Sequence, residues 1–147
     1  MIRRAGLGDV DAFRAIAAAA YGKYVSRMGR DPAPMTADYA EAIRSRQAWA
    51  AIEDGRIAGF AVLAARPGYL LLENVAVLPT AQNRGIGTRL LGLAEEHARS
   101  LGLSEIRLYT NEAMTENLAY YARRGYVETR RAEQEGFHRV FFRKLIA

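Results

Sequence analysis

The sequence predicts a single mixed α/β domain, and three observations support this class. The 147 residues are 50% hydrophobic and 25% charged, which is the composition of a globular chain long enough for one core. Two strand-like segments flank Asp54-Gly55, a typical hairpin turn. A strand, an amphipathic helix and another strand follow between residues 69 and 110, and such a unit is usually parallel. We therefore expect residues 1–147 to form one domain with both antiparallel and parallel pairing.

The first third of the chain is expected to hold one short edge strand and two helices. The edge strand is placed at residues 1–5. The first helix should begin after Asp9, a common N-cap residue, and end before Gly22. After a loop rich in Gly and Pro, Thr36 is expected to cap the second helix.

The rest of the chain alternates between strands and helices. Further strands are expected at 47–53, 56–65, 69–78, 106–110, 126–131 and 137–145, and helices at 86–101 and 113–124. Strand 69–78 is apolar on both faces, which places it in the centre of the sheet. Glu73 interrupts it, and strict alternation would put this side chain on the face of Val75 and Val77. A carboxylate there needs a partner, water or a proton.

Composition narrows the function classes. The net charge of +5 favours an anionic partner, with a nucleotide cofactor, RNA and DNA all open. The absence of cysteine excludes disulfides and thiol nucleophiles and suits a reducing, cytoplasmic location. His97 and His138 are far apart, so no metal site is expected. Charged residues interrupt the apolar N-terminus and no segment has the length of a membrane span, so we expect a soluble protein without membrane contact.

Residues 82–87, Gln-Asn-Arg-Gly-Ile-Gly, join the central strand to the next helix and suit a phosphate group. Glycines let a phosphate approach backbone N–H groups at a helix N-terminus. A P-loop would need a lysine, and a dinucleotide fingerprint would need a third glycine where Leu90 stands, so neither motif fits. The plainer alternative is that the glycines only shape a tight turn.

This loop resembles the acetyl-CoA signature of the GCN5-related N-acetyltransferases, Arg/Gln-x-x-Gly-x-Gly/Ala. Gln82, Gly85 and Gly87 match it, after a valine-rich strand as in that family. The resemblance follows the order of elements along essentially the whole chain.

A second segment, residues 117–126, is similar to the family's late Asn…Tyr-x-x-x-Gly-Phe sequence. Tyr121, Gly125 and Tyr126 are in register with it. The fuller family spacing would put the asparagine at Met114 rather than at Asn117.

The resemblance implies a GNAT fold, an α/β (α+β) architecture with a central mixed, mostly antiparallel sheet flanked by about four helices. Its parallel strands should splay to admit the pantetheine arm. It implies transfer of an acetyl or short acyl group from acetyl-CoA to a small-molecule or peptide amine by direct attack on the thioester, without metal and without a nucleic-acid partner. Acceptor identity, acyl chain and oligomeric state, monomer or homodimer, stay open. The implied cofactor-binding residues are Val75, Val77, Gln82, Asn83, Arg84, Gly85, Ile86, Gly87, Thr88 and Asn117.

The resemblance also implies two catalytic residues. Tyr121 would be the general acid for the CoA thiolate, or else a packed aromatic. Glu73 would be the general base, directly or through water, or else part of an ion pair or a substrate-orienting group; Leu71 occupies another position that the family uses. Main-chain N–H groups at Val75 or Val77 would stabilise the oxyanion. The acceptor pocket would involve Tyr21, Tyr24, Met28, Met35 and Tyr39, which equally suit plain packing.

Two other function classes remain open at this point. A non-catalytic acyl-CoA-binding regulator would need the loop but neither Glu73 nor Tyr121. A basic nucleic-acid-binding domain would not need the glycines.

Overall fold

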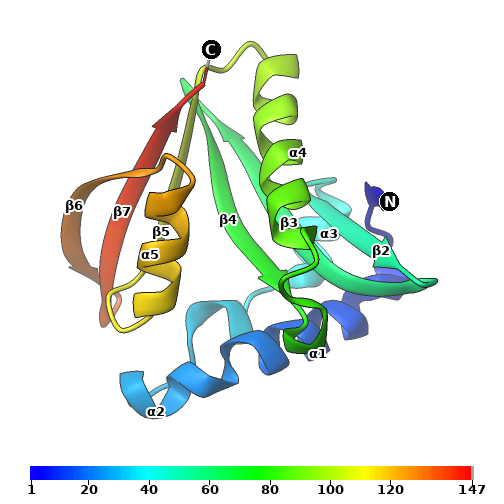
Figure 1. The fold of residues 1–147 in the computed structure, drawn as a ribbon, viewed down its shortest axis with the longest axis horizontal. Coiled ribbons are helices and arrows are strands. Elements are labelled where there is room, and N and C mark those ends of the chain that lie inside the picture. Colours follow the sequence, from blue (N-terminus) through cyan, green and yellow to red (C-terminus); the bar gives the residue numbers. More distant parts are fainter. Residues whose placement is uncertain (147) are drawn as a thin grey trace.

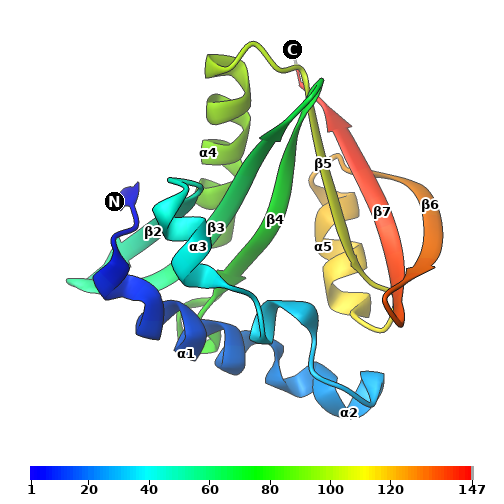
Figure 2. The ribbon, with the colours of Figure 1, turned by 180° about the vertical axis from the view of Figure 1, so that it is seen from behind.

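In a computed structural model, which describes residues 1–146, the chain forms a seven-stranded sheet in the order β1-β2-β3-β4-β5-β7-β6 (Figures 1 and 2). The strands are β1 (Ile2–Arg4), β2 (Ala48–Glu53), β3 (Arg56–Arg66), β4 (Tyr69–Val77), β5 (Glu105–Asn111), β6 (Val127–Gln134) and β7 (Phe137–Leu145). The helices are α1 (Val10–Tyr21), α2 (Val25–Met28), α3 (Tyr39–Arg44), α4 (Ile86–Ser100) and α5 (Thr115–Arg123), with short 3-10 turns η1 (Leu7–Asp9), η2 (Gly22–Tyr24), η3 (Ala33–Met35) and η4 (Pro79–Ala81). All neighbouring strands are antiparallel except β4 and β5, which confirms the mixed, mostly antiparallel sheet.

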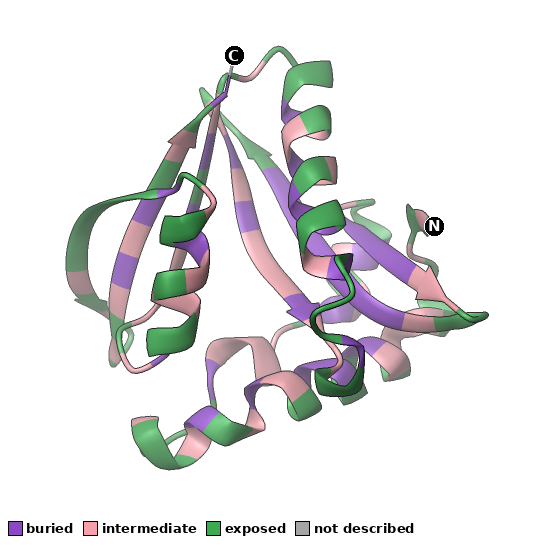
Figure 3. Ribbon diagram, viewed as in Figure 1, coloured by how far each residue is buried: buried purple, intermediate pink, exposed green. Residues whose placement is uncertain are grey.

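Helices cover both faces of the sheet and create two apolar clusters. One cluster joins α4 and Tyr121 of α5 to the sheet, and the other joins α1 and α3 to its opposite face. Buried residues accordingly follow β3, β4 and the inner side of α4 (Figure 3). No helix within residues 1–146 combines the length and the hydrophobicity needed to cross a bilayer.

The parallel strands β4 and β5 separate soon after they begin. Only Leu70 and Leu71 of β4 are paired with β5, opposite Ile106 and Arg107. The two strands then diverge, as Figure 1 shows. The expected splay is therefore confirmed, and the edge of β4 that faces β5 is unpaired beyond Leu71.

A β-bulge at Glu73 changes the face of the sheet toward which the side chains at the end of β4 point. Leu72 and Asn74 pair with successive residues of β3, so Glu73 is the additional residue. Leu72 belongs to the α4 cluster, and beyond the bulge Val75 and Val77 pack against that same cluster. Glu73 instead lies with Asn74 beside α3. The expectation that Glu73 shares a face with Val75 and Val77 is wrong, because the bulge interrupts the alternation.

Two capping assignments also need correction. The Asp9 carboxylate does precede α1, but it accepts a hydrogen bond from the Gly6 N–H at 2.8 Å and so closes η1 rather than the first turn of α1. Asp38, not Thr36, caps α3, because its Oδ1 accepts from the Glu41 N–H at 3.0 Å. Thr36 is left in the preceding turn.

The C-terminal half follows the predicted order with small shifts of boundary. Gly102 and Gly125 follow α4 and α5 with φ of 72° and 90°, the left-handed conformation that ends helices. Strand β6 runs further than expected, to Gln134, so the turn before β7 is only Glu135-Gly136. Strand β7 lies between β5 and β6 and brings its first residues close to the open end of the β4–β5 splay (Figure 1).

Candidate active site

The glycine loop turns the chain from β4 into α4. Asn83 and Gly85 both have positive φ, 66° and 81°, and Gly85 is the residue that precedes α4. Glycine adopts this conformation without the cost that a Cβ imposes. No side chain caps the first turn of α4, so its backbone N–H groups remain available to a ligand.

Gly87 makes room for a tyrosine that the sequence did not single out. A Cβ on Gly87 would lie 2.5 Å from the Tyr120 hydroxyl. The Arg124 guanidinium packs 3.6 Å from the centre of the Tyr120 ring and holds it in place. A side chain at position 87 would therefore displace Tyr120, so packing favours glycine here in addition to any role toward a phosphate.

The loop forms one side of a crevice, here named the loop crevice, at the splay of β4 and β5. Its lining comprises Ala20, Tyr21, Lys23, Tyr24, Val75, Ala76, Val77, Ala81, Gln82, Asn83, Gly85, Ile86, Gly87, Thr88, Glu116, Asn117, Tyr120, Tyr121, Arg123 and Arg124. The structure thus brings together all the predicted cofactor-binding residues except Arg84. That guanidinium points elsewhere and forms an ion pair with Glu53 at 2.8 Å.

The charge of the loop crevice is predominantly positive. Lys23, Arg123 and Arg124 line it, and Glu116 is the acidic residue among the lining. The Glu116 carboxylate is already engaged by Arg27 at 2.6 Å and Lys23 at 3.3 Å. The hydrogen bond from Arg27, with a second from Thr115, holds the pKa of Glu116 well below its usual value. The crevice is therefore suited to an anionic ligand.

The open edge of β4 presents backbone groups to the same crevice. The Val75 carbonyl accepts a hydrogen bond from the Tyr21 hydroxyl at 2.9 Å, and the Val77 carbonyl accepts one from Gln82 Nε2 at 3.3 Å. Both carbonyls thus point away from β3. Because the N–H and C=O of one strand residue point to the same side, the Val75 and Val77 N–H groups also face the crevice.

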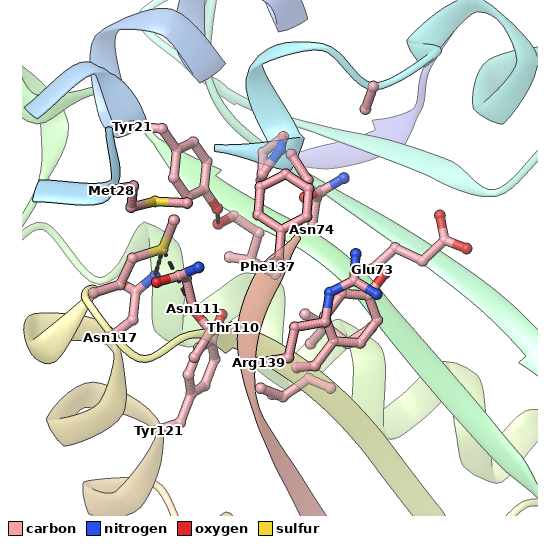
Figure 4. A pocket seen from close by; sticks show the side chains of 18 residues that line it. Tyr21, Met28, Glu73, Asn74, Thr110, Asn111, Asn117, Tyr121, Phe137 and Arg139 are labelled. Atoms are coloured by element: carbon pink, nitrogen blue, oxygen red, sulfur yellow. Dashed lines mark hydrogen bonds between the residues drawn. The ribbon is translucent and has the colours of Figure 1, made fainter. Parts of the chain in front are cut away.

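A second cavity, here named the inner pocket, adjoins the loop crevice. The two share four lining residues, Tyr21, Val75, Asn117 and Tyr121. The inner pocket extends past Met28, Thr110 and Asn111 toward Phe137 and Arg139 of β7 (Figure 4).

Tyr121 stands at the junction of the two cavities. Its ring is only 7% exposed and packs edge-on against Tyr120 and Tyr126. Among residues 1–146 its hydroxyl has no hydrogen-bond partner. Burial raises the pKa of Tyr121 well above its ordinary value near 10, so the phenol remains protonated and its O–H is available as a donor.

Glu73 lies away from Tyr121, on the other side of the inner pocket (Figure 4). Its side chain is 32% exposed and its Oε1 is 3.3 Å from Arg66 Nη2. The expected buried carboxylate is thus a half-exposed one that is paired with an arginine. The structure does not place it in contact with Tyr121.

The aromatic and methionine residues of the N-terminal helices divide into site and core. Tyr21 and Met28 line the inner pocket, and Tyr24 lines the loop crevice. Tyr39 is core, because its ring lies 5.2 Å from that of Phe60. In the part of the chain that the structure describes, no three His, Asp or Glu side chains are grouped so that they could hold a metal ion.

Solved structures of known acetyltransferases share this fold. The structure of the PaiA N-acetyltransferase from Thermoplasma acidophilum in complex with coenzyme A superposes with a TM-score of 0.77 at 17% identity, over 99% of this chain and 98% of that one. The ribosomal-protein-S18-alanine N-acetyltransferase from Escherichia coli gives 0.77 at 19% identity, over 100% and 94%. At these identities the likeness shows the fold alone, and it confirms the predicted GNAT architecture.

Sequence comparison adds the family. The uncharacterized protein YxbD of Bacillus subtilis (strain 168) is 39% identical over 54 residues, which span 37% of this chain and only 34% of that protein. The family model described as the Acetyltransferase (GNAT) family matches residues 11–126. That match contains the glycine loop, the open edge of β4 and Tyr121, and the chain therefore belongs to the GNAT acetyltransferase family.

Proposed function

We propose that this protein is an acetyl-CoA-dependent N-acetyltransferase that moves an acetyl or short acyl group to a small-molecule or peptide amine by direct attack of the amine on the thioester. The observation that carries the proposal is the position of Tyr121. Its protonated hydroxyl, free of any partner among the described residues, lies where a crevice suited to an anionic cofactor meets a second pocket.

The loop crevice fits acetyl-CoA in three respects. Uncapped N–H groups at the start of α4 suit a pyrophosphate, as does the positive end of the helix dipole. Lys23, Arg123 and Arg124 supply cations for the phosphates. The unpaired edge of β4 offers hydrogen bonds to the amide groups of pantetheine. Bound acetyl-CoA would supply an activated thioester carbonyl.

The residues at the junction then have distinct roles in the transfer. The N–H of Val75 or Val77 donates to the thioester oxygen as it gains negative charge. The amine nitrogen bonds to the acetyl carbon, and the C–S bond breaks. Tyr121 donates its proton to the departing thiolate, which its protonated state allows. Asn117 orients the pantetheine arm from the shared wall.

The incoming amine must lose a proton, because an alkyl ammonium has a pKa of about 10.4. Glu73 lines the inner pocket on the side away from Tyr121, so its proposed role is that of a base acting through water. Glu73→Gln should then lower kcat most strongly at neutral pH, where the amine is protonated. An unchanged pH–rate profile would assign Glu73 to the Arg66 ion pair alone.

A thiol-release assay over a panel of amines tests the activity, with Tyr121→Phe as the informative variant. We expect this variant to lose about 10²–10⁴-fold in kcat and to retain acetyl-CoA binding in calorimetry. Tyr126→Phe is the matched control, because the Tyr126 hydroxyl is buried without a partner and its ring lies 5.6 Å from that of Tyr121. Full turnover by Tyr121→Phe would remove the acid role.

The same samples separate the other function classes. Binding of acetyl-CoA without acetylation of any amine would indicate an acyl-CoA-binding regulator. The absence of any heat of acetyl-CoA binding by a folded sample would contradict the cofactor assignment itself.

A further inference from the structure

The inner pocket contains a charged side chain that the proposed chemistry does not use. Arg139 of β7 is half-buried, and Figure 4 shows it between Tyr121 and Glu73. Its guanidinium carbon lies 4.3 Å from the centre of the Tyr109 ring, and its Nη1 donates to Gln134 Oε1 at 2.9 Å. The guanidinium is therefore held in one place, with most of its N–H donors uncommitted.

This arginine forms no ion pair with any of residues 1–146, although acidic residues are common on the surface. The pocket's own carboxylate, Glu73, is instead paired with Arg66. Arg30 adds a second cation nearby, 3.9 Å from the centre of the Phe137 ring, and its Nη1 donates to a backbone carbonyl rather than to a carboxylate. The end of the inner pocket away from the loop crevice is thus positive.

We infer that the acceptor is an amine that also carries a carboxylate, a free amino acid in the simplest case, and that Arg139 binds this carboxylate. The inference rests on the proposed function, since it assigns the substrate class of the same site. A guanidinium matches a carboxylate with two parallel hydrogen bonds. The amine of such a substrate would then extend toward Tyr121 and Val75, where the thioester is expected.

The same charges disfavour other amines. A polyamine or an aminoglycoside is cationic along its length and would meet an uncompensated guanidinium, with Glu73 already engaged. A peptide N-terminus has an amide where a free amino acid has its carboxylate, so it leaves Arg139 without an anionic partner. A polyamine, and an amino-acid carboxamide in place of the peptide N-terminus, therefore serve as comparisons in the test.

The test compares each standard amino acid with its carboxamide, and both with spermidine, in the thiol-release assay. We expect the preferred amino acid to exceed its carboxamide by at least about tenfold in kcat/KM, the effect of one charge-assisted hydrogen bond. Arg139→Gln should raise the KM for the acid by a similar factor and leave the KM for the carboxamide unchanged. Arg139→Lys should restore part of the loss.

Arg143→Gln is the matched control, because Arg143 lies four residues further along β7, on the same face, and is exposed outside the pocket. It should leave both KM values unchanged. Acetyl-CoA binding by every variant shows that the fold is intact.

Each contrary result has a distinct meaning. Equal activity on acid and carboxamide, or equal loss on both in Arg139→Gln, would overturn the inference. Turnover of spermidine alone would also overturn it and leave the proposed function in place. A protein that binds acetyl-CoA and acetylates none of these amines would overturn this inference, and the wider amine panel would then decide the proposed function separately.

Discussion

Substituting alanine for Gly87 tests how closely α5 packs on the start of α4. The added Cβ would lie 2.5 Å from the Tyr120 hydroxyl, a separation that real Cβ contacts do not show, and 3.5 Å from the ring carbon that carries it. Tyr120 must therefore move. Arg124 opposes this movement, because its guanidinium packs on the ring and its Nη1 donates to the Tyr120 carbonyl at 3.2 Å.

The expected cost follows from two opposing terms. Forcing an extra carbon into a packed site typically costs about 1–3 kcal/mol. Replacing glycine by alanine inside a helix returns at most about 1 kcal/mol. Gly87→Ala should thus lower the free energy of unfolding by about 0–3 kcal/mol. In a protein that already carries Tyr120→Phe, the atom nearest to the added Cβ is the terminal ring carbon of residue 120, at an ordinary contact distance. Gly87→Ala should then be neutral or stabilising by up to about 1 kcal/mol.

Urea unfolding of the two single variants and the double variant measures this difference as a coupling energy. We expect a coupling of about 1–3 kcal/mol between positions 87 and 120. Gly85→Ala is the control: it has open space but a φ of 81°, so its cost of about 1–2 kcal/mol comes from the backbone and should not depend on Tyr120. A coupling near zero for Gly87 would refute the packing argument, and an unchanged KM for acetyl-CoA in Gly87→Ala would contradict the phosphate role of the loop.

Three further predictions concern stability. Asp38→Ala should cost about 1 kcal/mol, measured by urea unfolding, because it removes the cap of α3, whereas Thr36→Ala should cost little. Burial lowers the pKa of His97 in the folded state below its ordinary 6.5, so the unfolded chain takes up the proton first as the pH drops. The free energy of unfolding should therefore fall as the pH drops through and below 6.5, and His97→Gln should flatten this decline. Tyr21→Phe should cost about 1–2 kcal/mol of unfolding free energy, since it leaves the Val75 carbonyl without its buried partner, and an unchanged urea midpoint would contradict that hydrogen bond.

The order of elements was predictable because each depends on local sequence. Strand-like apolar segments on both sides of Asp54-Gly55 indicated a hairpin, and glycines marked the ends of the long helices. The bulge in β4 was not predictable in this way. Apart from Glu73 and Asn74, residues 70–78 are apolar on both faces, so the pattern of apolar residues does not show that one residue is additional. The orientation of Glu73 was therefore assigned incorrectly from the same pattern that placed its strand correctly.

The site residues likewise divide into those that local sequence identifies and those that only the tertiary structure identifies. The loop residues are consecutive in the chain, so a sequence motif identified nearly all of them. The direction of the Arg84 side chain depends on the positive φ values of the flanking residues and could not be predicted from the motif. Tyr120 and Tyr121 are neighbours on one helix; the register with Gly125 identified Tyr121, whereas the packing of Tyr120 against Gly87 is visible only in the structure. Arg139 enters the site because β7 lies between β5 and β6, a long-range pairing that local sequence does not report.

The bulge also explains how one residue can matter to the site without touching the reacting atoms. In a strand, side-chain face and hydrogen-bond direction alternate together. If Glu73 were accommodated by regular alternation instead of by a bulge, Val75 and Val77 would turn their side chains from α4 toward α1 and their N–H groups from the crevice toward β3. The bulge depends on the number of residues rather than on the carboxylate. Glu73→Gln should therefore keep the acetyl-CoA KM of the unmodified protein even where kcat falls, whereas a raised KM would show that the carboxylate itself maintains the edge of β4.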